Sequence, residues 1–214
     1  VTQPTCAIST GSFTITNYNA ALTYVINPST GVTRSGNTVT APSGTYTLTA
    51  SNGACTSGSS LSVTVNAQPT TPTAPTLSAV TQPTCLISTG SFTITNYNAG
   101  FTYVINPSTG VTRSGNTVTA PAGTYTLTAS NGACTSGSSL SVTVDVQPTT
   151  PSAPTLSGVT QPTCVVSTGS FTITNYNAAF TYVFNPSTGV TRSGSTVTAP
   201  SGTYTLTASN GACT

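Results

Sequence analysis

The chain carries almost no charge. Of its 214 residues, three are Lys or Arg, one is Asp or Glu and none is His, so charged residues make up 2% of the sequence, against about 25% in ordinary soluble proteins. General acid–base catalysis, carboxylate pairs and two-metal sites all need groups that are missing here. The composition therefore predicts a protein that is not an enzyme and that binds no metal or cofactor.

Other absences exclude further classes of protein. The three basic residues, Arg34, Arg113 and Arg192, occur singly and form no basic patch for nucleic acid. No apolar run approaches the roughly 20 residues of a membrane span. There is no Met and the sequence begins at Val1, so we expect a mature segment or a part of a longer protein.

What the chain has instead is hydroxyl groups and internal repetition. It contains 51 Thr and 29 Ser, so neutral polar groups must keep it soluble. The hexapeptide VTQPTC begins at residues 1, 80 and 159, which gives a period of 79 residues. The first two copies differ at eight positions, and the partial third copy differs from the first at five. A period of this length is typical of small self-contained domains.

Short runs of alternating residues predict strands. Apolar residues alternate with Thr or Ser over residues 13–16, 45–50 and 61–65, and Leu22, Tyr24 and Ile26 alternate with Thr23 and Val25. This is the two-residue period of a half-buried strand. Turn residues such as those at 35–37 separate the runs. About seven short strands per repeat and no helical spacing predict an all-β fold of tandem immunoglobulin-like β-sandwich domains, arranged as beads on a string.

The repeats set the expected domain boundaries. We expect immunoglobulin-like repeats at residues 1–66, 77–145 and 156–214, the third lacking its last strand, with Pro/Thr connectors at 67–76 and 146–155. Proline at about every third connector residue favours polyproline II, a semi-rigid spacer that holds the repeats apart.

Two cysteines, 49 positions apart, recur in every repeat. They are Cys6, Cys55, Cys85, Cys134, Cys164 and Cys213. An even number at a repeating spacing, with no His for a metal site, predicts disulfides and an oxidising compartment. The favoured pairing joins the two cysteines of one repeat. The alternative joins Cys55 to Cys85 across the connector.

One tyrosine in each repeat is expected to have a structural role. The segment APSGTYTL at residues 41–48 resembles the approach to the penultimate strand of immunoglobulin-like domains, where a tyrosine hydroxyl closes a corner. This predicts tyrosine corners at Tyr46, Tyr125 and Tyr204.

The surface offers two kinds of candidate carbohydrate site. Thr beside Pro in the connectors is typical of O-glycosylation. The candidate sites are Thr70, Thr71, Thr73, Thr76, Thr149, Thr150 and Thr155. A second and weaker candidate is contact with a bound sugar by Tyr18, Tyr97 and Tyr176, each of which lies between two asparagines.

The blocks VTQPTC, GTYTLTASNGAC and QPTTPTAPT, in this order and spacing, resemble the SprB-type repeats of gliding-motility adhesins secreted by Bacteroidota. The resemblance implies an extracellular or cell-surface protein with immunoglobulin-like repeats that form a stalk or filament. It carries no catalytic residues.

We therefore expect a structural tandem-repeat protein, either the stalk of a surface adhesin or the building block of an extracellular filament. Its main partner would be itself, through lateral association or through donation of another chain's lead segment to the incomplete third repeat. The alternative is a carbohydrate-binding adhesive module that recognises surface glycans.

Overall fold

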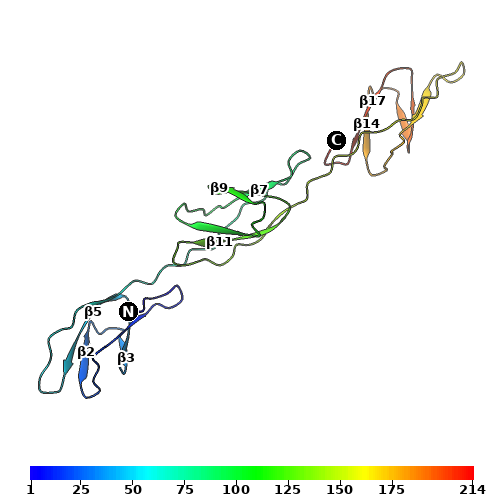
Figure 1. The fold of residues 1–214 in the computed structure, drawn as a ribbon. Helices are drawn as coiled ribbons and strands as arrows, with labels where there is room; N and C mark the ends of the chain where they lie inside the picture. The colour runs from blue at the N-terminus through cyan, green and yellow to red at the C-terminus, as the bar shows by residue number, and fades with distance from the viewer. The chain divides into compact units, whose positions relative to one another are not determined.

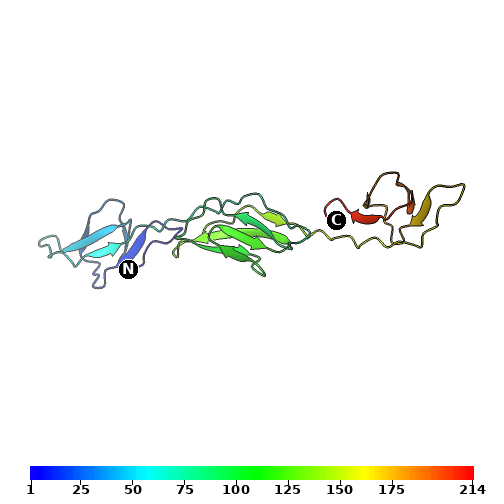
Figure 2. The same ribbon diagram turned by 90° about the horizontal axis from the view of Figure 1, so that it is seen from above.

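The computed structural model describes residues 1–214 and contains strands but no helix (Figure 1 and Figure 2). No segment forms a helix long and apolar enough to cross a membrane. The strands form small antiparallel sheets that recur along the chain. The predicted all-β fold class is confirmed.

The first repeat contains two three-stranded sheets. Its strands are β1 (Gly11–Thr14), β2 (Thr23–Asn27), β3 (Thr33–Ser35), β4 (Thr38–Ala41), β5 (Gly44–Ser51) and β6 (Val63–Val65). One sheet has the order β1-β4-β3 and the other β2-β5-β6, with every pairing antiparallel.

The later repeats follow the same plan. The second has β7 (Gly90–Thr93), β8 (Thr102–Asn106), β9 (Thr112–Ser114), β10 (Thr117–Ala120), β11 (Gly123–Ser130) and β12 (Val142–Val144). The third has β13 (Gly169–Thr172), β14 (Thr181–Asn185), β15 (Thr191–Ser193), β16 (Thr196–Ala199) and β17 (Thr205–Ser209). Their sheets are β7-β10-β9, β12-β11-β8, β13-β16-β15 and the two-stranded β14-β17. Each complete repeat has six strands and short isolated bridges, where the sequence predicted about seven strands.

The core of the first repeat forms between its two sheets. Phe13 and Val39 come from one sheet, while Ile26, Tyr46 and Val65 come from the other, and all five belong to one buried cluster. The alternation in the sequence produces this arrangement because successive side chains of a strand point to opposite faces. The buried side chains of these strands therefore face the partner sheet, as in a β-sandwich, whereas β3 is exposed throughout.

A two-residue turn shows how local sequence sets the pairing. Gly36 and Asn37 connect β3 to β4, and Gly36 has a φ of 58°. A positive φ suits the turn types whose twist matches a β-hairpin, and glycine adopts it without a steric penalty. The turn fixes the pairing of Ser35 with Thr38.

The chain divides into two compact units, and the division passes through the second repeat. The first unit comprises Val1–Leu77, Thr95–Asn106 and Thr126–Leu140. The second unit comprises Ser78–Ile94, Pro107–Tyr125 and Ser141–Thr214. The domain boundaries drawn from the repeat period stay a prediction.

Candidate functional site

Two disulfides join residues of different repeats. Cys6 is bonded to Cys134 within the first unit, and Cys85 is bonded to Cys213 within the second. Both bonds span 128 positions, with 5.7 Å between the two Cα atoms. The first cysteine of one repeat is therefore bonded to the second cysteine of the next.

This connectivity corrects the sequence prediction. Neither the pairing within one repeat nor the alternative bond between Cys55 and Cys85 is present, and Cys55 and Cys164 are exposed free thiols. The reason is physical: a disulfide needs two Cα atoms within about 7 Å, and the turn that carries Cys6 meets a turn of the following repeat.

Each disulfide connects two tight turns. In the first unit, Thr5 and Ile8 exchange two backbone hydrogen bonds around Cys6, of 3.0 and 3.3 Å. The partner turn is closed by Asn131, whose side-chain Oδ1 accepts hydrogen bonds from the backbone N–H groups of Ala133 and Cys134. An Asn side chain that bonds to backbone two and three residues ahead stabilises such turns.

The connector takes part in the same site. The Gln68 side chain donates to the carbonyl oxygens of Thr5 and Cys6, at 3.2 and 3.1 Å. Asn131 Nδ2 donates to the carbonyl of Thr70 at 2.8 Å. The connector is thus hydrogen-bonded to both turns, which corrects the expectation of a spacer that holds the repeats apart.

We call residues 5–8, 68–70 and 131–134 the first junction. The second unit repeats it as the second junction, residues 84–87, 147–149 and 210–213. There Gln147 donates to the carbonyls of Thr84 and Cys85, and Asn210 donates to that of Thr149. The two junctions therefore have the same contacts at equivalent positions of the repeat.

The chemistry available at a junction is covalent cross-linking. Each disulfide closes a loop of about 130 residues, which in the chain-entropy model destabilises the unfolded chain by about 5 kcal/mol. That is comparable with the whole stability of a small domain. Nowhere in the chain do three His, Cys, Asp or Glu side chains gather as a metal centre would require.

The three candidate corner tyrosines have the contact expected of them. The hydroxyl of Tyr46 donates to the carbonyl of Pro42 at 2.8 Å, and those of Tyr125 and Tyr204 donate to the corresponding prolines at 2.9 Å. Tyr46 and Tyr125 are each 2% exposed, whereas Tyr204 is half-buried.

Each candidate sugar-contacting tyrosine packs against neighbouring side chains of its own repeat. Tyr18 stacks on Tyr24 with 5.5 Å between ring centroids, and the Arg34 guanidinium carbon lies 5.6 and 5.5 Å from the two centroids. Tyr97 stacks on a second tyrosine in the same way. Tyr176 also stacks, and Arg192 lies 5.3 Å from its centroid. The sequence reasoning missed this role of arginine, although its recurrence at one position of every repeat was visible.

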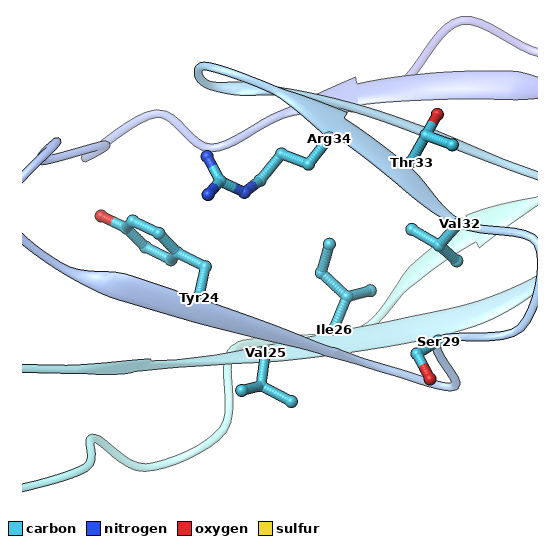
Figure 3. Close-up of a pocket in the computed structure, with 7 residues that line it drawn as sticks. All are labelled: Tyr24, Val25, Ile26, Ser29, Val32, Thr33 and Arg34. Carbon is cyan, nitrogen blue, oxygen red and sulfur yellow. The ribbon is translucent and has the colours of Figure 1, made fainter. Parts of the chain in front are cut away.

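A cavity of about 260 Å³ lies beside the stacked pair in the first repeat. It is lined by Tyr24, Val25, Ile26, Ser29, Val32, Thr33 and Arg34. Figure 3 shows the Tyr24 ring and the Arg34 guanidinium on the same side of β2, while the Val25 side chain points away from them. Tyr18, the predicted contact, is not among the lining residues.

All seven candidate O-glycosylation residues are exposed. In two of them the side-chain hydroxyl already forms a hydrogen bond with another threonine hydroxyl. Thr76 bonds to Thr95 at 2.5 Å, and Thr155 bonds to Thr174 at 2.6 Å. A sugar on either hydroxyl would replace that contact. Thr70, Thr71, Thr73, Thr149 and Thr150 form no such side-chain pair and stay the better candidates.

Comparison with known proteins gives no family. No protein-family model and no curated protein matches the sequence. Solved structures resemble it distantly. The marsupial T cell receptor is 13% identical, with a TM-score of 0.41 over 94% of this chain and 95% of that one.

Two further solved structures have lower TM-scores. The first to third fibronectin domains of chicken CNTN1 are 11% identical, with a TM-score of 0.29 over 96% of this chain and 84% of that one. The bacterial S-layer protein rSbsC(31–844) is 15% identical, with a TM-score of 0.21, and the match covers 92% of this chain and 31% of that one. Scores this low carry no information about function. The resemblance to SprB-type repeats stays a prediction.

Proposed function

We propose that the chain is a structural segment of an extracellular protein, the stalk of a surface adhesin or the shaft of a filament, whose consecutive repeats are stapled by disulfides. The observation that carries this proposal is the repeated junction. Both disulfides link one repeat to the next in the same register, and the connector is hydrogen-bonded at each. Cross-linking successive repeats serves mechanical continuity rather than the stability of a single repeat.

The disulfides also support an extracellular or cell-surface location, since such bonds persist in oxidising compartments. An uncharged surface rich in hydroxyls agrees with O-linked sugar, which would shield sheet edges that have few charges to protect them.

The length of chains with different numbers of repeats tests the structural role. We expect chains of three and six repeats to appear in electron micrographs as particles whose longest dimension grows in proportion to the number of repeats. Compact particles of nearly equal dimension would contradict the proposal.

An antibody against the chain should label intact cells of the source organism without permeabilisation, and labelling only after permeabilisation would contradict the proposed location.

A second candidate function is weak carbohydrate binding at the cavity beside Tyr24 and Arg34. An aromatic ring, a guanidinium and the hydroxyls of Ser29 and Thr33 are suitable groups for a sugar. A glycan array probed with the native chain and with an Arg34→Ala, Arg113→Ala, Arg192→Ala variant would test it. Selective binding lost in the variant is expected, and an array without signal would exclude this function.

A further inference from the structure

The arginine of the first repeat carries a positive charge that no side chain of that repeat neutralises. Arg34 is the only charged side chain of residues 1–66. The single acidic side chain of the whole chain, Asp145, follows β12 in the second repeat. A guanidinium stays protonated throughout the pH range in which proteins fold. Arg34 is therefore a permanent cation without a counter-ion in its own repeat.

Neutral groups hold this guanidinium in place. Its Nη1 donates to the carbonyl of Gly36, and its Cζ lies 5.6 Å from the ring centroid of Tyr18 and 5.5 Å from that of Tyr24. Both rings attract a cation through their π electrons. Only one of the five N–H groups of a guanidinium is used by Gly36. The charge is thus fixed in position while most of its donors are left for a ligand.

A second unused donor lies beside the guanidinium. The Tyr24 hydroxyl accepts the backbone N–H of Asn19 at 2.8 Å, which fixes the ring, and its own proton goes to no protein acceptor. Figure 3 shows this hydroxyl and the Arg34 guanidinium at the same end of the cavity described above. Two kinds of donor therefore converge there without an acceptor between them.

The remainder of the cavity is largely apolar and small. Ile26, which is 9% exposed, and the half-buried Val32 line it from β2 and from the start of β3. Its volume of about 260 Å³ is below the roughly 300–1,000 Å³ of pockets for drug-sized ligands. The cavity is therefore suited to a single small ring rather than to an extended peptide.

Donors without acceptors favour a ligand that only accepts. An ionised carboxylate has acceptors alone, and its two oxygens match the N–H groups of a guanidinium in pairs. A neutral sugar would leave the charge of Arg34 without a partner. A sugar that carries a carboxylate supplies the anion and also a compact ring with C–H groups for the apolar part of the cavity.

We propose that the cavity of the first repeat binds a carboxylate-bearing sugar residue, such as a uronic acid of an acidic polysaccharide. The carboxylate accepts hydrogen bonds from Arg34 and from the Tyr24 hydroxyl, and the C–H groups of the sugar ring pack on Ile26 and Val32. This inference rests on the carbohydrate binding proposed above as the second candidate function, and it names the class of sugar.

The other repeats give an internal comparison. The second repeat has the same residues at all seven lining positions, so the site around Arg113 should respond as that of Arg34 does. The third repeat differs at one of them, where the larger Phe184 replaces Ile26. There Arg192 Nη1 also donates to the Tyr176 hydroxyl at 3.1 Å. A smaller cavity and a further donor already in use predict weaker binding at Arg192.

Arginine side-chain NMR tests the proposal on the intact chain. The chain has three arginines and no lysine, so three Nε–H signals report the three sites, and each is assigned by its loss in one Arg→Gln variant. Trigalacturonate should shift the Arg34 signal saturably, and the Arg192 signal with an affinity several-fold lower. An unchanged Arg34 signal, or equal affinities at Arg34 and Arg192, would overturn the proposed site.

The methyl ester of the same trisaccharide isolates the contribution of the carboxylate, because it keeps the rings and loses the charge. Its Kd should be about tenfold higher, as expected for lost hydrogen bonds to a charged group. Equal affinities would overturn the preference for acidic sugars and leave carbohydrate binding intact. Binding of neither ligand would overturn both. The stalk function is tested separately by particle length.

Two other anions test whether the ligand is a sugar. Sodium sulfate and triglutamate, at equal charge and ionic strength, should displace trigalacturonate only at concentrations at least tenfold higher. Displacement by sulfate at equal concentration would show a site for any small anion. Displacement by triglutamate at equal concentration would show a peptide site. Either result would overturn the assignment to a sugar.

A matched set of variants locates the contacts. Arg34→Gln should weaken binding at least tenfold, followed through the backbone amide of Asn19. Ile26→Phe should also weaken it by narrowing the cavity, and the same fold accommodates phenylalanine at the equivalent Phe184. Arg192→Gln should leave the affinity at Arg34 unchanged. Native affinity in the Ile26→Phe variant, or an equal loss in Arg192→Gln, would overturn the placement of the sugar in this cavity.

Discussion

Gln68 and Asn131 hold the first junction together without any charge. Each uses a neutral amide to bond backbone carbonyls that belong to the partner turn or to the connector. In a chain with one acidic residue, ion pairs cannot set the register between repeats. Amide-to-backbone bonds are less sensitive to salt than ion pairs, so the junction contacts should persist over a wide range of ionic strength.

The corner tyrosines give a prediction with an internal control. Tyr125→Phe removes a part-buried hydrogen bond to Pro121 and should lower the free energy of unfolding by about 1 kcal/mol. Tyr204→Phe should cost clearly less, because Tyr204 is half-buried and its proline carbonyl can be hydrated. Urea unfolding of the two variants measures the difference. A cost at Tyr204 equal to that at Tyr125 would contradict this account.

The free thiols give a second prediction at this scale. Iodoacetamide added to the native, unreduced chain should alkylate Cys55 and Cys164, which are exposed, and no other cysteine. Peptide mass spectrometry after labelling measures this. Labelling of Cys6 or Cys134 at comparable yield would show that the first junction is not closed.

At the scale of elements, β12 depends on a residue far from it in the sequence. Gln82 bonds both neighbours of Val144, at a separation of more than 60 residues. Gln82→Ala should therefore destabilise β12 locally by about 1–3 kcal/mol, seen as faster hydrogen exchange at residues 142–144. Gln161→Ala, in the repeat where no equivalent strand is present, should leave the exchange of β17 unchanged, and a similar acceleration in both variants would contradict this role of Gln82.

Strands and cores could be predicted from the sequence more completely than the junctions. The alternation around Phe13 and Tyr46 follows from the period of a strand, and the Gly36 turn follows from local backbone preference. The pairing of Cys6 with Cys134 depends on how the connector docks, which no local pattern encodes. The spacing of 49 positions between the two cysteines of each repeat is compatible both with a bond inside one repeat and with a bond between successive repeats. The sequence therefore could not distinguish the two pairings, and the favoured one was wrong.

At the scale of the whole chain, the two disulfide loops overlap. One loop encloses residues 6–134 and the other encloses residues 85–213. A single cut anywhere between Cys6 and Cys213 therefore leaves the pieces covalently joined. In the fibre proposed above, one cut of this kind would not interrupt the covalent path along the chain.

The same overlap limits how far the chain can be stretched. The shortest covalent path between the two ends runs from Val1 to Cys6, through the first disulfide to Cys134, back along the chain to Cys85, and through the second disulfide to Cys213. Apart from the short terminal segments, it contains only the 49 residue-to-residue links between Cys85 and Cys134. At 3.3–3.6 Å per residue, the contour is about 20 nm in the oxidised chain and about 75 nm in the reduced chain. Single-molecule force spectroscopy with and without reductant measures both lengths, and equal lengths would contradict the connectivity.

The most direct test of the disulfide connectivity between repeats is cleavage with trypsin. The three arginines are the only trypsin sites, because the chain has no lysine. Complete cleavage of the thiol-blocked, unreduced chain in urea gives fragments 1–34, 35–113, 114–192 and 193–214. The observed connectivity predicts two disulfide-linked species, 1–34 with 114–192 and 35–113 with 193–214. Pairing within each repeat would instead keep all four fragments in one species. Intact mass spectrometry distinguishes the two results: two species support the account, and a single species would contradict it.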